Sequence, residues 1–293
     1  MSAVAERSMG PPRTMPGRRA GRARTWGQVG RYAVVLVALA FFLFPIYWVV
    51  VTAFKLPAEF MRNPPVWFPA NPSLLQFQTV MELRGSTALR NSLIIATSAT
   101  VLSLVVGSLA AYALARFRTG GPNLGFWLLS QRMMPPVVLV IPMFLLFREI
   151  GWIDTHHGLI VLYAVLNLPY VIWMLKSYID AIPIEVEESA MVDGSSRLRV
   201  LWGITLPLTM PGIIATATFA FIFSWTEFLF AVVLTRNNTF TLPVTISGYF
   251  GSQGSAYGQA ASLAVVATAP LFLLGLLVQR HFVRGLTLGA VRG

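Results

Sequence analysis

The sequence predicts an all-α membrane protein in which six transmembrane helices carry a cytoplasmic helix-turn-helix between the fourth and the fifth. Apolar residues make up 56% and charged residues 11% of the chain, both far from the composition of a soluble domain. Several apolar runs have the roughly 20 residues that a helix needs to cross the hydrocarbon core. Residues 185–212 form a polar run between two such segments, which indicates contact with a partner outside the lipid.

The first 30 residues are rich in Arg, Gly and Pro and contain a single acid, Glu6. We expect a disordered basic tail in the cytoplasm, with the transmembrane domain covering residues 31–293. The first apolar run is of full length and lacks a small-residue cleavage pattern, so we interpret it as an uncleaved span. The formal charge of +11 would suit nucleic acid, but arginines beside a span need no such explanation, and no nucleic-acid partner is expected.

The six predicted spans are residues 32–54, 89–115, 124–147, 158–179, 213–234 and 260–282. Prolines lie inside four of them, where neighbouring helices can satisfy the freed carbonyls: Pro45, Pro135, Pro136, Pro142, Pro169 and Pro270. Basic residues are in excess on the segments that this order places inside, so both termini are predicted to be cytoplasmic.

Two long segments are then predicted to lie outside. Residues 56–88 are rich in proline and are interpreted as an irregular surface cap. Residues 235–259 carry glycines and tyrosines and are interpreted as a flexible loop. Such a loop is either an ordinary exposed connection or one that touches a polar ligand or an external protein.

The polar insert has the signals of two short helices. Pro183 offers a good first helical position, and three glutamates follow in the first turns, where the helix dipole favours negative charge. Gly194 is expected to end this helix, Ser195 or Ser196 to cap the next, and Pro207 to end that one. A surface helix that only anchors in anionic lipid usually has a basic polar face, so the acidic face favours a protein partner.

A spaced motif runs through this insert: Glu188-Ser189-Ala190, then Gly194, then Ile204-Thr205-Leu206-Pro207. It resembles the EAA loop of permease subunits of bacterial ABC importers, with Ser189 where that family most often has Ala. Three further stretches are similar to the carbohydrate-type, MalG-like permeases of this family: QRMMPP at 131–136, FSWTEFLFA at 223–231 and GLTLGAVRG at 285–293.

The resemblance implies the type I ABC importer permease fold in a bacterial plasma membrane. It implies a second, MalF-like permease as heterodimer partner, two cytoplasmic ATPase subunits that use ATP and Mg, and an extracytoplasmic solute-binding protein. The loop 183–207 would sit in a cleft of the ATPase. The expected solute is a sugar or sugar derivative; the alternatives are a phosphodiester, polyol or osmolyte, or an ion-coupled secondary transporter instead of an importer. The chain itself has no G-x-x-x-x-G-K-[ST] run, so a non-catalytic subunit without a cofactor is expected.

The predicted ATPase-coupling residues are Glu187, Glu188, Ser189, Ala190, Asp193, Gly194, Arg197, Ile204, Leu206 and Pro207. The predicted substrate path comprises Arg132, Asn167, Tyr170, Trp225 and Glu227, with Tyr163 as a further candidate. Intramembrane ionisable residues indicate function, although Arg132 and Glu227 could instead form a structural ion pair. The aromatic residues could likewise be packing or interface residues, and the partner permease could hold most of the sugar contacts.

Metal and covalent chemistry are not expected. The chain has no cysteine, which excludes disulfides, thiolate metal sites and cysteine nucleophiles. Its three histidines lie at or outside the ends of the predicted spans and have no carboxylate at ligand spacing. An intramembrane enzyme is therefore disfavoured.

Overall fold

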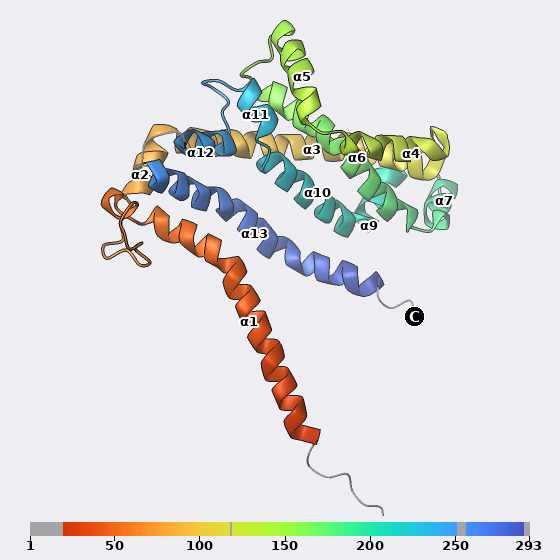
Figure 1. Cartoon of the computed structure of the whole chain (residues 1–293). Helices are drawn as coiled ribbons and strands as arrows, with labels where there is room; N and C mark the ends of the chain where they lie inside the picture. Colours follow the sequence, from red (N-terminus) through yellow and green to blue (C-terminus); the bar gives the residue numbers. More distant parts are fainter. Residues whose placement is uncertain (1–19, 118, 251–255, 290–293) are drawn as a thin grey trace, which may run out of the picture. The chain divides into compact units, whose positions relative to one another are not determined.

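A computed structural model describes residues 20–117, 119–250 and 256–289, and within these ranges every regular element is helical (Figure 1). The chain divides into two units, Met1–Trp48 and Val49–Gly293. The first unit contains α1 (Ala20–Ala53) up to Trp48. The second contains the last turn of α1 and all the other helices, and it carries the features relevant to function.

Four helical segments are long and apolar enough to cross a membrane: Gly30–Ala53 in α1, Leu75–Phe117, α6 (His156–Asp180), and Tyr257–Gln279 in α13 (Tyr257–Gly289). Two bent helix pairs pass the same test together, Asn123–Met133 with Val137–Glu149 and Arg197–Leu208 with Met210–Trp225. Counting each bent pair as one span gives six by length and composition alone, the number predicted from the sequence; in the second pair, Arg197–Leu208 belongs to the polar insert and Met210–Trp225 is the apolar half.

Several predicted boundaries are wrong, and each error has a local cause. Helix α1 already begins at Ala20, so residues 20–30 of the predicted tail are helical; Ala and Arg are good helix formers beside an apolar run. Residues 1–19 of that tail lie outside the described residues. The predicted irregular cap ends early, because α2 (Leu75–Val80) and a π-turn, η2 (Met81–Gly85), lead straight into α3 (Ser86–Phe117).

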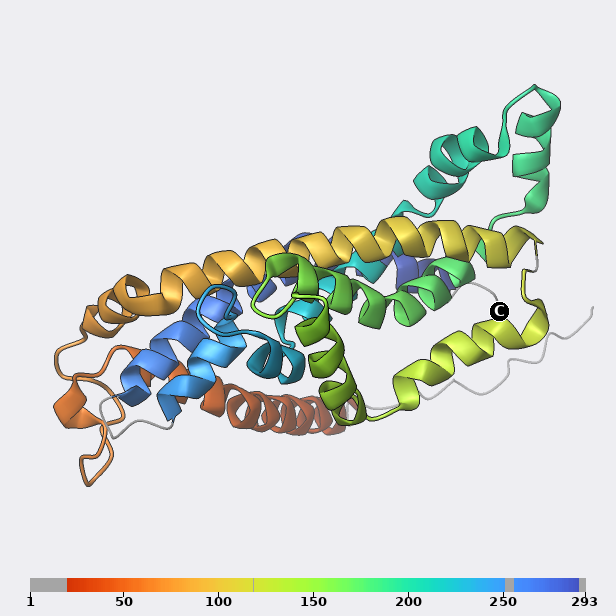
Figure 2. The same cartoon turned by 90° about the horizontal axis from the view of Figure 1, so that it is seen from above.

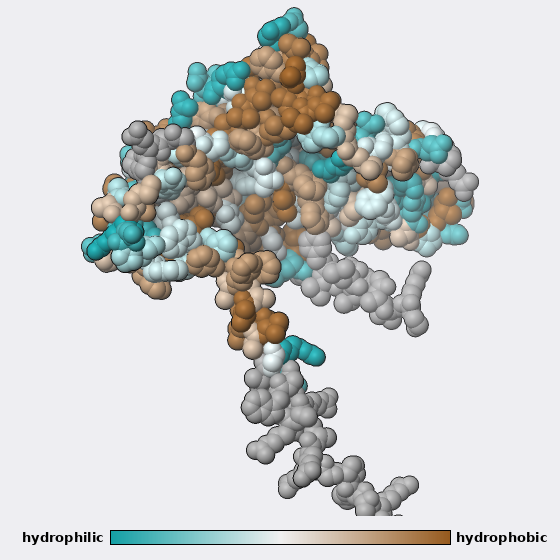
Figure 3. Space-filling view, viewed as in Figure 1, coloured by the Kyte–Doolittle hydropathy of each residue, from teal (hydrophilic) through white to brown (hydrophobic). Residues whose placement is uncertain are grey.

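The predicted third span is not one helix. It consists of α4 (Gly121–Ser130), a 3-10 turn η3 (Gln131–Met133) and α5 (Val137–Glu149), with a bend of 92° between the two halves. Pro135 and Pro136 come one residue after η3 and lack the N–H that a continuing helix needs. The intervening Met134 is extended, as the residue before a proline prefers. Exposed apolar side chains gather on α5, including Val137, Val138 and Ile141, as a lipid-facing surface requires (Figure 3).

The predicted fifth span is also divided, into α10 (Met210–Trp225) and α11 (Leu229–Leu234). The predicted flexible loop 235–259 contains a further helix, α12 (Leu242–Phe250), which lies beside α3 and α13 (Figure 1). Part of that loop, residues 251–255, lies outside the described residues. The first correction places a break inside a predicted helix, and the second places a helix inside a predicted loop.

Helix α3 runs through the second unit and contributes to three buried clusters. One cluster joins it to α5, α6 and α11, the second to α6 and α10, and the third to α10, α12 and α13. Its buried face is a row of small side chains three or four residues apart, among them Ala96, Ala99, Ser103, Gly107 and Ala111. Small residues let helix backbones approach closely, which matters in lipid because apolar surface alone does not drive helices together.

Gly107 tests this close approach. A Cβ at Gly107 would lie 2.5 Å from Cγ1 of Val171 on α6, whereas a Cβ at Gly125 of α4 would meet nothing within 4 Å. We expect Gly107→Ala to destabilise the bundle by about 1–3 kcal/mol through overpacking. Gly125→Ala, the matched helical control, should be neutral or slightly stabilising. Thermal unfolding in detergent measures both, and equal midpoints for the two variants would contradict the packing proposed for α3 and α6.

Candidate functional site

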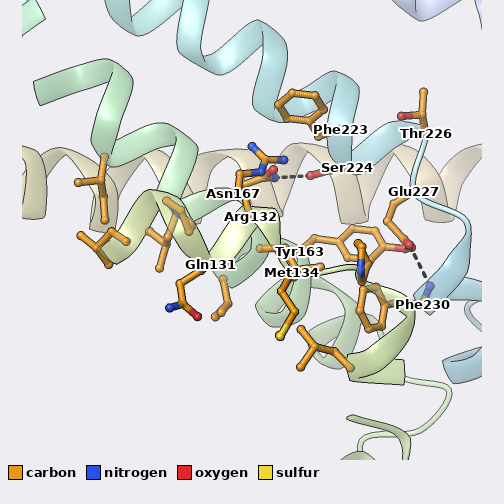
Figure 4. A pocket seen from close by; sticks show the side chains of 18 residues that line it. Gln131, Arg132, Met134, Tyr163, Asn167, Phe223, Ser224, Thr226, Glu227 and Phe230 are labelled. Carbon is orange, nitrogen blue, oxygen red and sulfur yellow. Dashed lines mark hydrogen bonds between the residues drawn. The ribbon is translucent and has the colours of Figure 1, made fainter. Parts of the chain in front are cut away.

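A cavity of about 530 Å³ lies in the second unit where the broken helices meet. Its walls come from α4, η3 and the start of α5, from the middle of α6, and from the end of α10 with the break that follows it. Most of the lining is apolar, and the polar side chains are few: Gln131, Arg132, Tyr163, Asn167, Ser224, Thr226 and Glu227 (Figure 4). Pockets of this size and character are typical of sites for small molecules.

Glu227 is held by three donors at the break between α10 and α11. The Tyr163 hydroxyl donates to one carboxylate oxygen at 2.6 Å, and the amides of Phe230 and Ala231 donate at 2.9 and 3.1 Å (Figure 4). The two amides belong to the first turn of α11, so the carboxylate satisfies N–H groups that the interrupted helix would leave without partners. Glu227 therefore stabilises the break and also lines the cavity.

Arg132 lines the same cavity but does not pair with Glu227. Its guanidinium lies over the ring of Phe223, 4.5 Å from the centroid, and over that of Tyr170, at 5.6 Å. Among the described residues, the ion pairs do not include Arg132, so the predicted alternative of a structural bridge to Glu227 is wrong. A cation–π contact uses the face of the guanidinium and leaves its in-plane N–H groups able to donate.

The remaining candidates separate into two groups. Asn167 is buried and lines the cavity, where its amide donates to the Ala220 carbonyl and the Ser224 hydroxyl. Tyr170 does not line the cavity, but its ring lies against the Arg132 guanidinium. Trp225 does not line the cavity: it is 3% exposed, belongs to the cluster with α12 and α13, and donates its indole N–H to the Ala267 carbonyl. Trp225 therefore occupies the packing position that the alternative describes, and its place on a substrate path stays a prediction.

The polar insert folds as a helical hairpin that projects from the bundle near the end of α3 (Figure 2). Its first arm is α7 (Ile184–Val192); its second arm comprises α8 (Arg197–Val200), a π-turn η4 (Leu201–Thr205) and α9 (Leu206–Leu208). We call residues 183–208 the hairpin. Two predicted caps are found: Gly194 follows α7, and the Ser196 hydroxyl accepts a hydrogen bond from the Arg199 amide.

Gly194 closes the first arm in a left-handed conformation, with φ of 86°. Its amide donates to the Met191 carbonyl and the Ser195 amide donates to the Ala190 carbonyl, the two hydrogen bonds of a Schellman motif. A side chain at this position would cost roughly 1–2 kcal/mol, because L-residues disfavour this backbone region. The bend between the arms therefore depends on glycine.

Pro207 does not end the second arm, contrary to the sequence-based expectation. The arm continues to Leu208, and the chain bends by 80° at Thr209 before α10. The short π-helix that ends at Thr205, two residues before Pro207, offers a physical reason, because its wider backbone pattern accommodates a residue that has no N–H to donate.

The predicted coupling residues are divided between the two faces of the hairpin. Those on its exposed face are Glu188, Ser189, Asp193, Gly194, Arg197 and Pro207, while Ala190 and Ile204 are half-buried. Leu206 and Glu187 are buried, and Glu187 is only 2% exposed. The two adjacent glutamates thus point in different directions, and only Glu188 can meet a partner directly.

Glu187 is the centre of a buried polar cluster that sequence reasoning missed. Arg116 donates to it through Nε at 3.0 Å and Nη2 at 2.9 Å, Thr205 donates at 2.9 Å, and Tyr112 donates to the second oxygen at 3.0 Å. Burial alone would raise the pKa of Glu187, but these hydrogen bonds and the Arg116 charge hold it below its ordinary value. The spacing of Tyr112 and Arg116, four residues apart on one helix face, was the available signal.

A second polar cluster fixes the segment before α12 at the opposite end of α3. The Asp154 carboxylate accepts from the amides of Arg236, Asn237, Asn238 and Thr239, at 2.9 to 3.3 Å, and from the side chains of Asn238 and Thr239. Burial alone would raise the pKa of Asp154, but these hydrogen bonds lower it to about 2. The residues that were predicted to be a flexible loop are therefore tied at their start.

A multi-pass helical bundle with a cavity between broken helices, and with a polar hairpin at one end, is the architecture expected of a membrane transport protein. Residues 103–288 match the family described as binding-protein-dependent transport system inner membrane component. The chain belongs to that family.

Relatives cover nearly its full length. The chain is 35% identical to the trehalose/maltose transport system permease protein MalG of Thermococcus litoralis over 257 residues, 86% of this chain and 92% of the relative. It is 33% identical to the diacetylchitobiose uptake system permease protein DasC of Streptomyces coelicolor over 273 residues, 92% of this chain and 98% of the relative. These matches confirm the predicted family and, with it, a multi-pass membrane protein that acts as a transport subunit.

The fold is also shared with a solved structure. A chain in the crystal structure of a bacterial ABC transporter involved in the import of the acidic polysaccharide alginate superimposes with a TM-score of 0.75. The match covers 92% of this chain and all of the other, at 22% sequence identity. The predicted all-helical permease fold is confirmed, and within the described residues no group of His, Cys, Asp and Glu side chains could hold a metal.

The Asp154 cluster gives a prediction about local stability. Asp154→Asn replaces one acceptor oxygen with a donor that faces N–H groups, so we expect the amides of residues 236–239 to exchange hydrogen about tenfold faster. The wild-type contribution should be complete above the ordinary pKa of 3.8 and be lost as the pH falls through about 2, because the folded-state pKa is the lower one.

Hydrogen exchange followed by mass spectrometry measures this effect. Glu149→Gln is the matched control, because Glu149 is an exposed acid near the same end that pairs with its neighbour Arg148. Unchanged exchange at residues 236–239 in Asp154→Asn would show that the segment is held by something other than the carboxylate.

Proposed function

We propose that the chain forms half of the translocation pathway of an ATP-driven importer for a sugar or sugar derivative. The observation that carries this proposal is the hairpin, whose spaced EAA-type motif presents Glu188 and a glycine-dependent bend on a projecting surface. Membership of the family, and relatives named for trehalose, maltose and diacetylchitobiose, support the solute class.

The exposed face of the hairpin has the chemistry of a protein interface. Its first arm carries Glu188 and the apolar Val192, which is 88% exposed. Its second arm adds two more exposed apolar side chains, Leu198 at 64% and Trp202 at 53%. Exposed apolar residues with a polar rim indicate a contact surface. The partner that fits is a cytoplasmic ATPase subunit, which binds ATP and Mg and imposes displacement on the hairpin.

The remaining partners follow from the same proposal. A MalF-like permease supplies the other half of the pathway, two ATPase subunits bind the two hairpins, and an extracytoplasmic solute-binding protein delivers the solute. Both termini and the hairpin face the cytoplasm of a bacterial cell, consistent with the excess of basic residues on those segments.

The cavity is the proposed solute pathway in this subunit. Arg132, Asn167 and Glu227 line it, together with Tyr163, and Tyr170 holds Arg132 in position. Glu227 and Asn167 already have partners within the chain. Arg132 is oriented by two aromatic rings, and none of the described residues accepts a hydrogen bond from it. Hydroxyl oxygens of a sugar are suitable acceptors for its N–H groups.

The proposal is tested with the complex that co-purifies with the tagged chain, reconstituted in liposomes with its binding protein. We expect ATP-dependent uptake of labelled maltose, trehalose or diacetylchitobiose. Uptake limited to glycerophosphocholine, sorbitol or glycine betaine would support an importer but contradict the proposed sugar class. A chain that purifies without an ATPase, or uptake driven by an ion gradient, would contradict the importer itself.

Two substitutions on the exposed face of the hairpin test coupling. Glu188→Gln removes a charged acceptor and Gly194→Asp forces a side chain into left-handed backbone, so both should lower uptake at least about tenfold while membrane insertion is retained. Glu185→Gln is the matched control, because Glu185 is an exposed acid of the same helix outside the motif. Normal uptake in Gly194→Asp would remove the hairpin from the coupling mechanism.

A further inference from the structure

The buried side of the hairpin is joined to α3 through one carboxylate. Glu187 lies on the first arm, and Thr205, on the second arm, donates to its Oε1 atom. Tyr112 and Arg116 of α3 donate to Oε2 and Oε1. The carboxylate therefore connects both arms of the hairpin to each other and to the C-terminal end of α3.

Arg116 extends this connection to α6. Its Nη2 atom also donates to the carbonyls of Ile179 and Ile182, at 3.0 and 3.1 Å, where α6 ends and the chain turns toward α7. The side chains of Arg116 and Glu187 are 7% and 2% exposed, so water does not compete for these hydrogen bonds. One guanidinium thus holds α3, the end of α6 and the first arm of the hairpin in a fixed arrangement.

The covalent connections between the hairpin and the bundle transmit movement less directly than these hydrogen bonds do. The hairpin connects to α10 through an 80° bend at Thr209 and to α6 through the short turn at residues 181–183. A bend of this kind can open or close without moving the next helix as a rigid rod. Charge-assisted hydrogen bonds from a planar fork are directional, and they resist sliding of the hairpin against α3.

We propose that Arg116 is a positioning residue that makes the hairpin and the C-terminal end of α3 move as one body. Displacement imposed on the hairpin then reaches α3 directly, and through the small-residue face of α3 it reaches the helices around the cavity. This inference rests on the proposed coupling role of the hairpin. It assigns the joint to Glu187 and Arg116, neither of which needs to touch the ATPase.

The joint is tested by spin-label distances in a complex whose other subunits are made cysteine-free, since this chain has no native cysteine. Labels at Glu185→Cys, on the hairpin but outside the motif, and Val101→Cys, on α3, both replace exposed residues. Without nucleotide, we expect a narrow distance distribution in the otherwise wild-type complex and a broader one in Arg116→Gln. On trapping with ATP, the distance should stay constant with Arg116 present and shift in Arg116→Gln.

A functional readout separates positioning from a merely structural role. We expect Arg116→Gln to lower the amount of labelled solute transported per ATP hydrolysed by about tenfold while hydrolysis continues. A structural role alone would reduce transport and hydrolysis in proportion to the assembled complex. Lys176→Gln is the matched control, because it breaks the exposed pair with Asp180 near the same end of α6 and should change neither readout.

Two further variants keep the proposal testable if Arg116→Gln fails to fold. Arg116→Lys keeps the charge without the fork, and Tyr112→Phe removes one donor; both should give intermediate transport per ATP. A label distance that shifts with ATP in the presence of Arg116, or unchanged transport per ATP in every variant of the cluster, would overturn the joint. A wild-type complex that hydrolyses no ATP would contradict the proposed function instead, and the nucleotide-free distances would still decide whether Arg116 holds the hairpin.

Discussion

The close approach of α3 to its neighbours is the constraint on which the second unit depends. In lipid there is no hydrophobic driving force for helices to associate, so the association depends on van der Waals contact between backbones that lie close together. The small residues on the buried face of α3 provide that access, and Gly107 is the tightest point, directly against Val171. Hydroxyl groups in the same row, such as Thr100 and Ser103, donate to carbonyls of their own helix and add no unsatisfied polar atom.

The helices packed around α3 include two that are interrupted, and their breaks lie at the cavity. Prolines and the break after α10 interrupt two predicted spans, and an interrupted helix in a membrane must find partners for its free N–H and C=O groups. At the end of α10 the Glu227 carboxylate serves this purpose for α11. The polar side chains that satisfy a break are thereby brought to the wall of the cavity.

The sequence was sufficient for what depends on composition and short-range pattern. Apolar length predicted the membrane fold, and the spacing around Gly194 predicted a hairpin with its bend at the right residue. It was insufficient where a residue's role depends on the face it occupies in three dimensions. Trp225 and Glu227 are two residues apart, yet one packs against α13 and the other lines the cavity, because the helix ends between them. Pattern also could not reveal α12, since a Gly- and Tyr-containing segment is equally compatible with a loop.

The adjacent glutamates of the hairpin also have roles that depend on the helix face each one occupies, which the sequence alone does not show. Successive residues of a helix point about 100° apart, so Glu187 and Glu188 cannot both face the bundle. Burying a carboxylate is costly unless it is paired and hydrogen-bonded, and Glu187 meets that condition through Arg116, Thr205 and Tyr112. An apolar residue could have filled the same space, but it would have formed no directional contact with three elements at once. The buried acid therefore holds the hairpin on the bundle, which leaves its exposed neighbour free to contact a partner.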